Sequence, residues 1–165
     1  MPGGRGTRPG KAAPHCKVRV DFPTYPRRER GDRGEHVKAA QCFLRQQGHY
    51  DGRLHGRYTP ATAKAVRRFT AGVSGLPTGS VLTARAWTAL LSYGGTPVAK
   101  FGSGGNEVRR IQRSLNAAVK AGLAVDGVIA GATRKAVREY QERRAMGRTG
   151  VVDDRVWGLL QRGRR

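Results

Sequence analysis

The stretch AVDGVIAGATRKAVREYQ, residues 124–141, contains a turn, a helix start and an amphipathic helical face in direct succession. Its Asp-Gly pair at 126–127 is typical of a tight turn, because glycine adopts positive φ without strain and aspartate hydrogen-bonds nearby backbone. Ala136, Val137 and Tyr140 then recur at helical spacing, which predicts a helix with one buried face.

The same pattern occurs 71 residues earlier in the chain. At this offset, residues 31–71 align with residues 102–142 without a gap. Identical pairs recur along the alignment, including Gly31/Gly102, Val37/Val108, Gln41/Gln112, Leu44/Leu115, Gly56/Gly127, Thr62/Thr133 and Arg67/Arg138. After a one-residue deletion, Trp87 aligns with Trp157. An alignment that keeps its register over a whole module indicates an internal duplication.

Each copy predicts three helices. In the first copy, Thr59-Pro60 is typical of an N-cap followed by the first helical position, and Thr83 is placed to cap a short third helix. Asp153 is the corresponding cap in the second copy. The sequence therefore predicts an all-α fold of two tandem three-helix-bundle modules with a largely irregular N-terminal arm, with at most a short extended pair in the loops.

Composition shifts set the expected boundaries. Residues 1–29 are expected to form a largely disordered arm, which packs irregularly on the first module where the two meet. The two modules are expected at residues 30–91 and 101–161. Residues 92–100 form a linker short enough to keep the modules near one another, and residues 162–165 form a basic tail.

The formal net charge is +21, from 32 Lys and Arg against 11 Asp and Glu. Such a chain attracts polyanions, whether nucleic acid, anionic membrane or anionic wall polymers, and charge alone does not choose among them. No apolar run is long enough to span a membrane, and the N-terminus lacks the hydrophobic core of a secretory signal. A removed signal, a piece of a longer exported protein and an intracellular chain all remain open.

Two cysteines bear on that choice. If Val37, Ala40 and Leu44 form the buried stripe of the first helix, Cys42 projects away from it, and we expect it to lie outside the core. Cys16 lies in the arm. We predict a Cys16–Cys42 disulfide that attaches the arm to the first helix, with two free thiols as the alternative. A disulfide would imply an oxidising compartment.

Three segments, GSGGNEVRRIQRSL, VDGVIAGATRKAVREYQ and TGVVDDRVWGLL, resemble in order the type 1 peptidoglycan-binding repeat, a small three-helix module appended to bacterial cell-wall hydrolases. Both copies resemble it, over residues 30–161. The resemblance implies non-catalytic binding of peptidoglycan, through its glycan strand or stem peptide, by a secreted or wall-associated targeting module. Two linked sites would then act together on a repetitive polymer.

The candidate ligand contacts are residues of the turn that the resemblance includes, the side chains beside it, and arginines of the second helix whose guanidinium groups suit carboxylates or wall phosphates. They are Asp126, Gly127, Arg134, Arg138 and Gln141 in the second copy and His55, Gly56, Tyr58 and Arg67 in the first. The first copy departs from the family pattern, with His55 in place of Asp and Thr70 in place of Gln, so we expect the second copy to bind alone and the first to bind more weakly.

Structural roles compete with each of these assignments. The Asp-Gly pair also serves a plain turn, both tryptophans suit a core, and Gln41 and Gln112 on the buried stripe suit the satisfaction of loop backbone groups. The arginines of the second helix also suit a solvated face, with Glu139 and Glu142 as local partners.

Catalytic and cofactor roles find no support in the sequence. It has no H-E-x-x-H, S-x-x-K or nucleophile-elbow motif, and Asp153-Asp154 suits a helix start better than a glycosidase pair. His15, His49, His55 and the cysteines fit no common zinc spacing. We therefore expect no enzyme, no metal and no cofactor in this monomer. The alternatives are an Arg-rich nucleic-acid-binding protein and an assembly scaffold in a wall-associated or phage machine.

Overall fold

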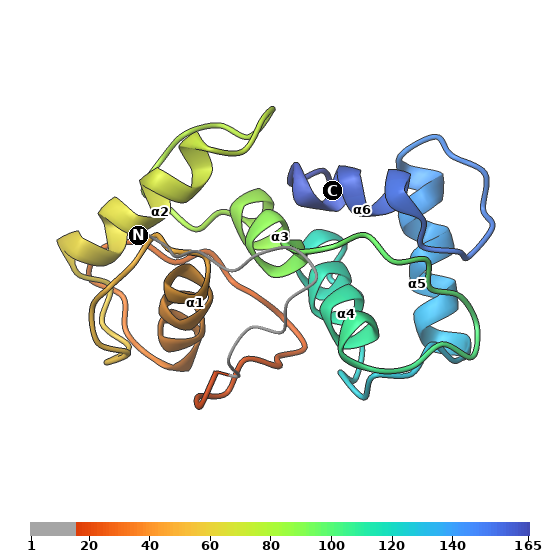
Figure 1. Cartoon of the computed structure of the whole chain (residues 1–165), viewed down its shortest axis with the longest axis horizontal. Helices are drawn as coiled ribbons and strands as arrows, with labels where there is room; N and C mark the ends of the chain where they lie inside the picture. The colour runs from red at the N-terminus through yellow and green to blue at the C-terminus, as the bar shows by residue number, and fades with distance from the viewer. Residues whose placement is uncertain (1–15) are drawn as a thin grey trace.

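A computed structural model describes residues 16–165. This part of the chain contains six helices, and its extended pairing is limited to four isolated bridges (Figure 1). The helices are α1 (Glu35–Gln46), α2 (Pro60–Ala71), α3 (Ala84–Ser92), α4 (Asn106–Ala118), α5 (Gly131–Arg143) and α6 (Asp154–Gln161). The all-α fold of two three-helix modules is confirmed, and residues 1–13 of the predicted disordered arm lie outside the described residues.

The predicted helix starts are also confirmed. The hydroxyl of Thr59 accepts from the backbone N–H of Thr62 at the start of α2, where Pro60 occupies the first helical position. Thr83 and Asp153 cap α3 and α6 in the same way, by accepting from the N–H three residues later. Each cap satisfies one of the backbone donors that a helix start leaves without an intrahelical partner.

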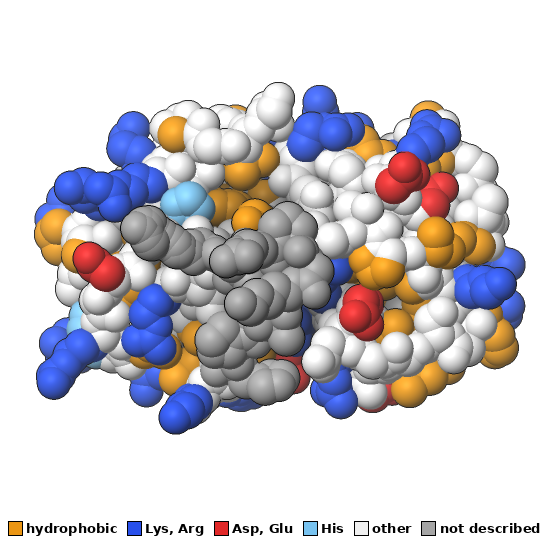
Figure 2. Space-filling model, in the orientation of Figure 1, with side chains coloured by type: hydrophobic (Ala, Val, Ile, Leu, Met, Phe, Trp, Pro, Cys, Tyr) orange, Lys and Arg blue, Asp and Glu red, His pale blue; other side chains and the backbone are white. Residues whose placement is uncertain are grey.

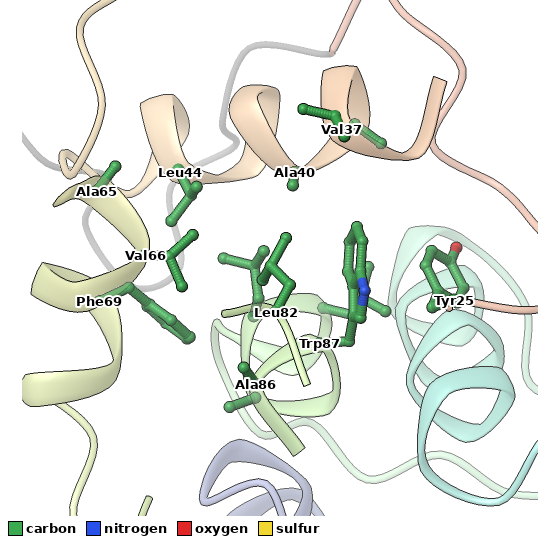
Figure 3. Packing of buried hydrophobic residues seen from close by; sticks show 14 of the residues in the cluster. Tyr25, Val37, Ala40, Leu44, Ala65, Val66, Phe69, Leu82, Ala86 and Trp87 are labelled. Atoms are coloured by element: carbon green, nitrogen blue, oxygen red, sulfur yellow. The ribbon is translucent and has the colours of Figure 1, made fainter. Parts of the chain in front are cut away.

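Each module has its own hydrophobic core. In the first, Val37 and Leu44 of α1 face Val66 of α2 and Trp87 of α3 (Figure 3). The second repeats this arrangement around Trp157. The Trp87 indole donates to the Pro26 carbonyl at 2.9 Å, and the Trp157 indole donates to the Pro97 carbonyl at 2.7 Å. Both tryptophans are therefore core residues with their one polar group satisfied.

Each module also includes a short extended segment that precedes its first helix and pairs with the residues before its third helix. Arg28 pairs with Leu82 in the first module as Ala99 pairs with Val152 in the second. The repeated unit therefore begins near residue 26 in the first copy and near residue 97 in the second. It includes the end of the predicted arm and the end of the predicted linker.

The arm is more deeply integrated than its irregular sequence predicts. Phe22 and Tyr25 are buried in the first core, and the Phe22 ring stacks on His36 of α1 with centroids 3.9 Å apart. Residues 16–29 are thus a structural part of the first module, where the sequence predicted that residues 14–30 pack on it irregularly. Phe22 and Tyr25 supply the packing that helical periodicity did not reveal.

The predicted disulfide joins Cys16 and Cys42. The expectation that Cys42 lies outside the protein interior is wrong, because the residue is only 2% exposed. The disulfide attaches Cys16 of the arm to this side of α1. A helical wheel of α1 alone does not contain this contact.

The two modules pack directly on each other. Helix α3 of the first module lies against α4 and α6 of the second (Figure 1). The approach is close because α4 carries small residues on this side, and one of them, Ala117, belongs to the first core. The arm joins this contact, since Asn116 donates to the Phe22 carbonyl at 2.9 Å and Arg113 pairs with Asp21 at 2.7 Å.

Residues 92–95, at the start of the linker, are held by hydrogen bonds to side chains of the second module. The Arg110 guanidinium donates to the carbonyls of Ser92 and Gly95, each at 2.8 Å, and lies 4.0 Å over the Trp157 ring. Gln161 donates to the Ser92 and Gly94 carbonyls, both at 3.0 Å. Burial lowers the pKa of Arg110 to about 10, so the group stays charged at neutral pH. These residues hold the modules near one another, as the short linker predicts.

No helix in the described part of the chain is both long and apolar enough to cross a bilayer.

Candidate functional site: the loops before α4 and α5

The candidate site of the second module is built around Gln112, a buried residue of α4. Its side-chain oxygen accepts from the Gly127 N–H at 2.9 Å. Its side-chain nitrogen donates to Asp126 at 2.9 Å, to the Val128 carbonyl at 3.2 Å and to the Thr133 hydroxyl at 3.1 Å. One amide therefore fixes the turn, and the predicted role of Gln112 in satisfying loop groups is confirmed.

Asp126 presents an exposed carboxylate at this turn. One oxygen accepts from Gln112 and from the Val128 N–H. These hydrogen bonds, with that of Gln112 the larger contribution, lower the pKa of the Asp126 carboxyl below its usual value. The site thus keeps a negative charge at a fixed position on the surface.

Gly127 must be glycine for two reasons. Its φ is +80°, and a Cβ there would lie 3.3 Å from the Gly105 carbonyl oxygen. The two loops pair closely, because the Gly105 N–H donates to the Gly127 carbonyl at 2.8 Å and the Ile129 N–H donates to the Ser103 carbonyl at 2.9 Å. The family-type Asp-Gly turn therefore has a clear structural role beside any role in binding.

The first module builds the same turn from different residues. Gln41 accepts from the Gly56 N–H and donates to the Arg57 carbonyl, both at 3.0 Å. His55 takes the place of the aspartate, and its Nδ1 accepts from the Arg57 N–H at 3.0 Å. Histidine thus preserves the hydrogen bond that shapes the turn and removes the carboxylate.

Two further candidates, Gln141 and Tyr58, occupy structural positions. Gln141 is buried, accepts from the Gly150 N–H at 2.9 Å, and donates to Thr149 and Val151. In the first module, Thr70 accepts from the Gly79 N–H, also at 2.9 Å, so the departure from Gln preserves the loop contact. Tyr58 is buried and donates to the Ser80 carbonyl, and burial raises the pKa of its hydroxyl.

The candidate arginines separate by module. The side chains of Arg134 and Arg138 lie side by side along α5 and both approach Gly150. A Cβ built on Gly150 would lie 2.9 Å from the Arg134 side chain and 3.2 Å from that of Arg138. Arg67 is exposed on α2. The predicted acidic partners do not neutralise α5, since Glu142 faces Arg148 of the following loop at 3.7 Å.

One residue of this surface was missed by the sequence reasoning. Phe101 is 56% exposed, and the Arg134 guanidinium lies 4.5 Å over its ring. The aligned residue of the first copy is Arg30, so a comparison of the two copies at exposed positions contained the signal. The Phe101 ring is exposed at a turn that is followed by Gly102, so burial in a core does not account for it.

The chemistry of the site is that of polar and charged recognition. Over residues 16–165, no group of three or more His, Cys, Asp or Glu side chains is placed to hold a metal ion. The surface offers one fixed carboxylate, two adjacent guanidinium groups and one exposed aromatic ring. Such groups bind carboxylates, amides and hydroxyls by hydrogen bonds and pair with apolar faces of a ligand.

Solved structures include several chains that are similar to part of this one. A peptidoglycan-binding protein from Clostridioides difficile, in complex with glutamine hydroxamate, is 24% identical over 42% of this chain and 44% of its own, with a TM-score of 0.40. The SleB N-terminal domain is 29% identical over 41% of this chain and 92% of its own (TM-score 0.39). A fused zinc-dependent amidase/peptidase with a peptidoglycan-binding domain from Clostridium acetobutylicum ATCC 824 is 32% identical over 40% of this chain and 29% of its own (TM-score 0.36).

Each of these likenesses thus covers less than half of the chain, and the chain spans less than half the length of the first and third structures. A search of curated protein sequences finds no match. A model of the family described as "Putative peptidoglycan binding domain" matches residues 33–90 and again residues 104–160. These two segments make up most of the chain and coincide with the two helical modules, so the chain belongs to this peptidoglycan-binding family, as a tandem of two copies.

Proposed function

We propose that this protein is a non-enzymatic targeting or anchoring element that holds a wall-remodelling protein on peptidoglycan, with its second module as the main contact. The observation that carries the proposal is the double family match, combined with a set of charged groups that the second module alone has in full. That set comprises Asp126, Arg134 and Arg138, whereas Gly127 shapes the turn and Gln141 holds the neighbouring loop.

These groups suit the chemistry of the polymer. Peptidoglycan presents carboxylates and amides on its stem peptides and hydroxyls on its sugars. Guanidinium groups bind carboxylates through paired hydrogen bonds, and an ionised Asp126 accepts from amide N–H or sugar O–H groups. The net charge of +21 adds long-range attraction to stem peptides and to anionic wall polymers.

In the first module the corresponding groups are weaker partners for such a ligand. His55 replaces the carboxylate, Ala63 aligns with Arg134, and only Arg67 repeats the arginine at 138. His55 and Gly56 retain the turn, so this module contributes charge and packing rather than a second equal site. Removing it is not a clean test, because the modules share an interface.

The disulfide and the family both support a location outside the cytoplasm, since disulfides persist in oxidising compartments. We infer that the protein is secreted or wall-associated and acts as a monomer.

Co-sedimentation of the full chain with purified sacculi tests the function. We expect the protein to pellet with sacculi, with or without wall teichoic polymers, and to retain appreciable binding at high salt, because specific contacts outlast screened charge. Duplex DNA at two salt concentrations is the control for nonspecific attraction. Binding to DNA alone, with a steep salt dependence, would contradict the proposal and favour the nucleic-acid alternative.

A further inference from the structure

We propose that Phe101 is a sugar-binding platform of the second module, which takes a pyranose ring of the glycan strand while Arg134 and Arg138 take a carboxylate of the attached stem peptide. The inference rests on the proposed function and names the part of the polymer that each group contacts.

Phe101 is held at the tip of a tight turn. The Ser103 N–H donates to the Lys100 carbonyl at 2.8 Å, and the Ser103 hydroxyl accepts from the Lys100 N–H at 3.0 Å. The following residue, Gly102, donates to the Ile129 carbonyl at 2.9 Å, which ties the turn to the loop before α5. The ring is therefore presented to solvent by an ordered backbone, so a ligand would not have to order this loop on binding.

Arg134 adds to this platform. Its guanidinium stacks on the Phe101 ring at 4.5 Å, and its side chain passes over Gly150 beside that of Arg138. Gly150 has a φ of +75°, and a side chain at this position would displace both arginines. The backbone of the loop before α6 thus leaves room for an aromatic ring and two adjacent cations on one surface.

Both cations retain capacity for an anionic ligand. Within the described residues, neither Arg134 nor Arg138 forms a salt bridge, and the Arg138 Nε is buried without a hydrogen-bond partner. A carboxylate placed beside the ring would pair with guanidinium groups that are already positioned by packing.

The first module provides an internal comparison. It forms the same turn, where the Asp32 N–H donates to the Glu29 carbonyl at 3.0 Å and the Asp32 carboxylate accepts from the Glu29 N–H at 2.8 Å. Arg30 is the tip residue there. Two other exposed apolar residues of the second module, Val98 and Val128, also align with arginines of the first.

The hydrophobic exposure therefore belongs to the second copy and not to the turn itself. Figure 2 shows hydrophobic side chains at several places on the half of the molecule formed by α4, α5 and α6. An apolar ring bordered by cations fits a polymer whose sugars present C–H faces and whose stem peptides carry carboxylates.

The test compares full-length variants on two ligands, which are intact sacculi and glycan strands freed of stem peptides by an amidase. We expect Phe101→Ala and Phe101→Arg, the residue of the first copy, to weaken binding to both ligands about tenfold, as for a central contact residue. Tyr93→Ala is the matched control, because Tyr93 is an exposed aromatic residue outside this surface, and it should change binding less than about twofold. Arg138→Ala should weaken binding to sacculi; stripped glycan is not a readout for this variant, because amidase cleavage of the stem peptide leaves a free carboxylate on the muramic acid.

The outcomes separate this inference from the proposed function. If wild-type protein fails to bind sacculi, the proposed function fails. If it binds sacculi and the Phe101 variants bind equally well, the platform is overturned and the function stands. If it binds sacculi but not stripped glycan, the sugar assignment is overturned and the stem peptide is the ligand. Thermal melting of each variant checks that the fold is retained.

Discussion

The two modules repeat the same helical arrangement and many of the same internal hydrogen bonds, and four of the aligned positions at which their residues differ change a contact or the surface. Cys42 and Arg113 both attach to the N-terminal arm, one by a disulfide to Cys16 and one by an ion pair to Asp21. Ala39 becomes Arg110, which fastens the linker. His55 and Arg30 become Asp126 and Phe101, which change the surface.

These differences between aligned residues show which parts of the repeat are constrained by folding. Gln41 and Gln112 hold the same turn through the same backbone atoms. Thr70 and Gln141 differ in side chain, but each accepts a hydrogen bond from the aligned glycine N–H of the next loop. Several positions that face solvent or the other module have diverged. The comparison therefore separates a shared scaffold from a surface specific to the second copy.

The largest expected effect tests the shared scaffold. Trp157→Ala removes a fully buried indole, its hydrogen bond to Pro97 and the surface on which Arg110 stacks. We expect the free energy of unfolding to fall by about 3–5 kcal/mol, measured by urea denaturation. Trp87→Ala should give a loss of similar size. A loss below about 1 kcal/mol for either variant would show that the two cores are not equivalent.

Removal of the disulfide is expected to have the next largest effect on the free energy of unfolding. The disulfide closes a loop with a sequence separation of 26 residues, and its loss should lower the free energy of unfolding by about 2–4 kcal/mol. Cys42→Ser should loosen the arm and leave the helices folded, as followed by proteolysis of the arm and by circular dichroism. Asp21→Asn is the matched change at the second attachment, with an expected loss of about 1 kcal/mol or less. Titration of unreduced protein should find no free thiol in the described residues.

The two turn glutamines give a smaller and sharper comparison. Gln41→Ala and Gln112→Ala each leave a buried glycine N–H unpaired, and each should lower the free energy of unfolding by about 1–3 kcal/mol. Only Gln112→Ala should also weaken binding to sacculi, because only Gln112 orients a carboxylate. Equal losses of binding in both variants would show that the first module contributes as much as the second.

The smallest effect concerns the charge of Asp126. Its pKa is lower in the folded protein than in the unfolded chain, so its contribution to stability is present above the unfolded value, near 3.9, and is lost as pH falls through the folded value. An NMR titration of the carboxyl carbon should give a midpoint below 3.9. Gln112→Ala should move the midpoint upward. A wild-type midpoint at or above 3.9 would contradict the hydrogen-bonded geometry.

Much of the fold follows from local chemistry that the sequence displays. Thr59-Pro60 marks a helix start whatever lies around it, and a repeated Gln on a buried stripe has few other uses than to satisfy a turn. The disulfide was predictable because only two cysteines are present. Each of these features depends on residues close in sequence or on a pattern that both copies repeat.

The remaining features depend on contacts between the copies. Arg110 and Asn116 align with Ala39 and Arg45, so a comparison that looks for identity passes over them. Their roles exist only because α3 and the arm lie against α4. The small residues Ser114, Ala117 and Ala118 were the available signal, since they align with Phe43, Gln46 and Gln47 and permit close approach of a neighbouring helix.

Helix α3 belongs to the first repeat by sequence, yet all of its residues from Ala86 to Ser92 are buried, because α4 and α6 cover the side that its own module leaves open. The repeat boundary is therefore not a boundary between independently melting units. Opening either module would expose apolar surface of the other, so the pair should unfold in one cooperative transition. Calorimetry should then give a van't Hoff enthalpy that matches the calorimetric enthalpy of the whole chain.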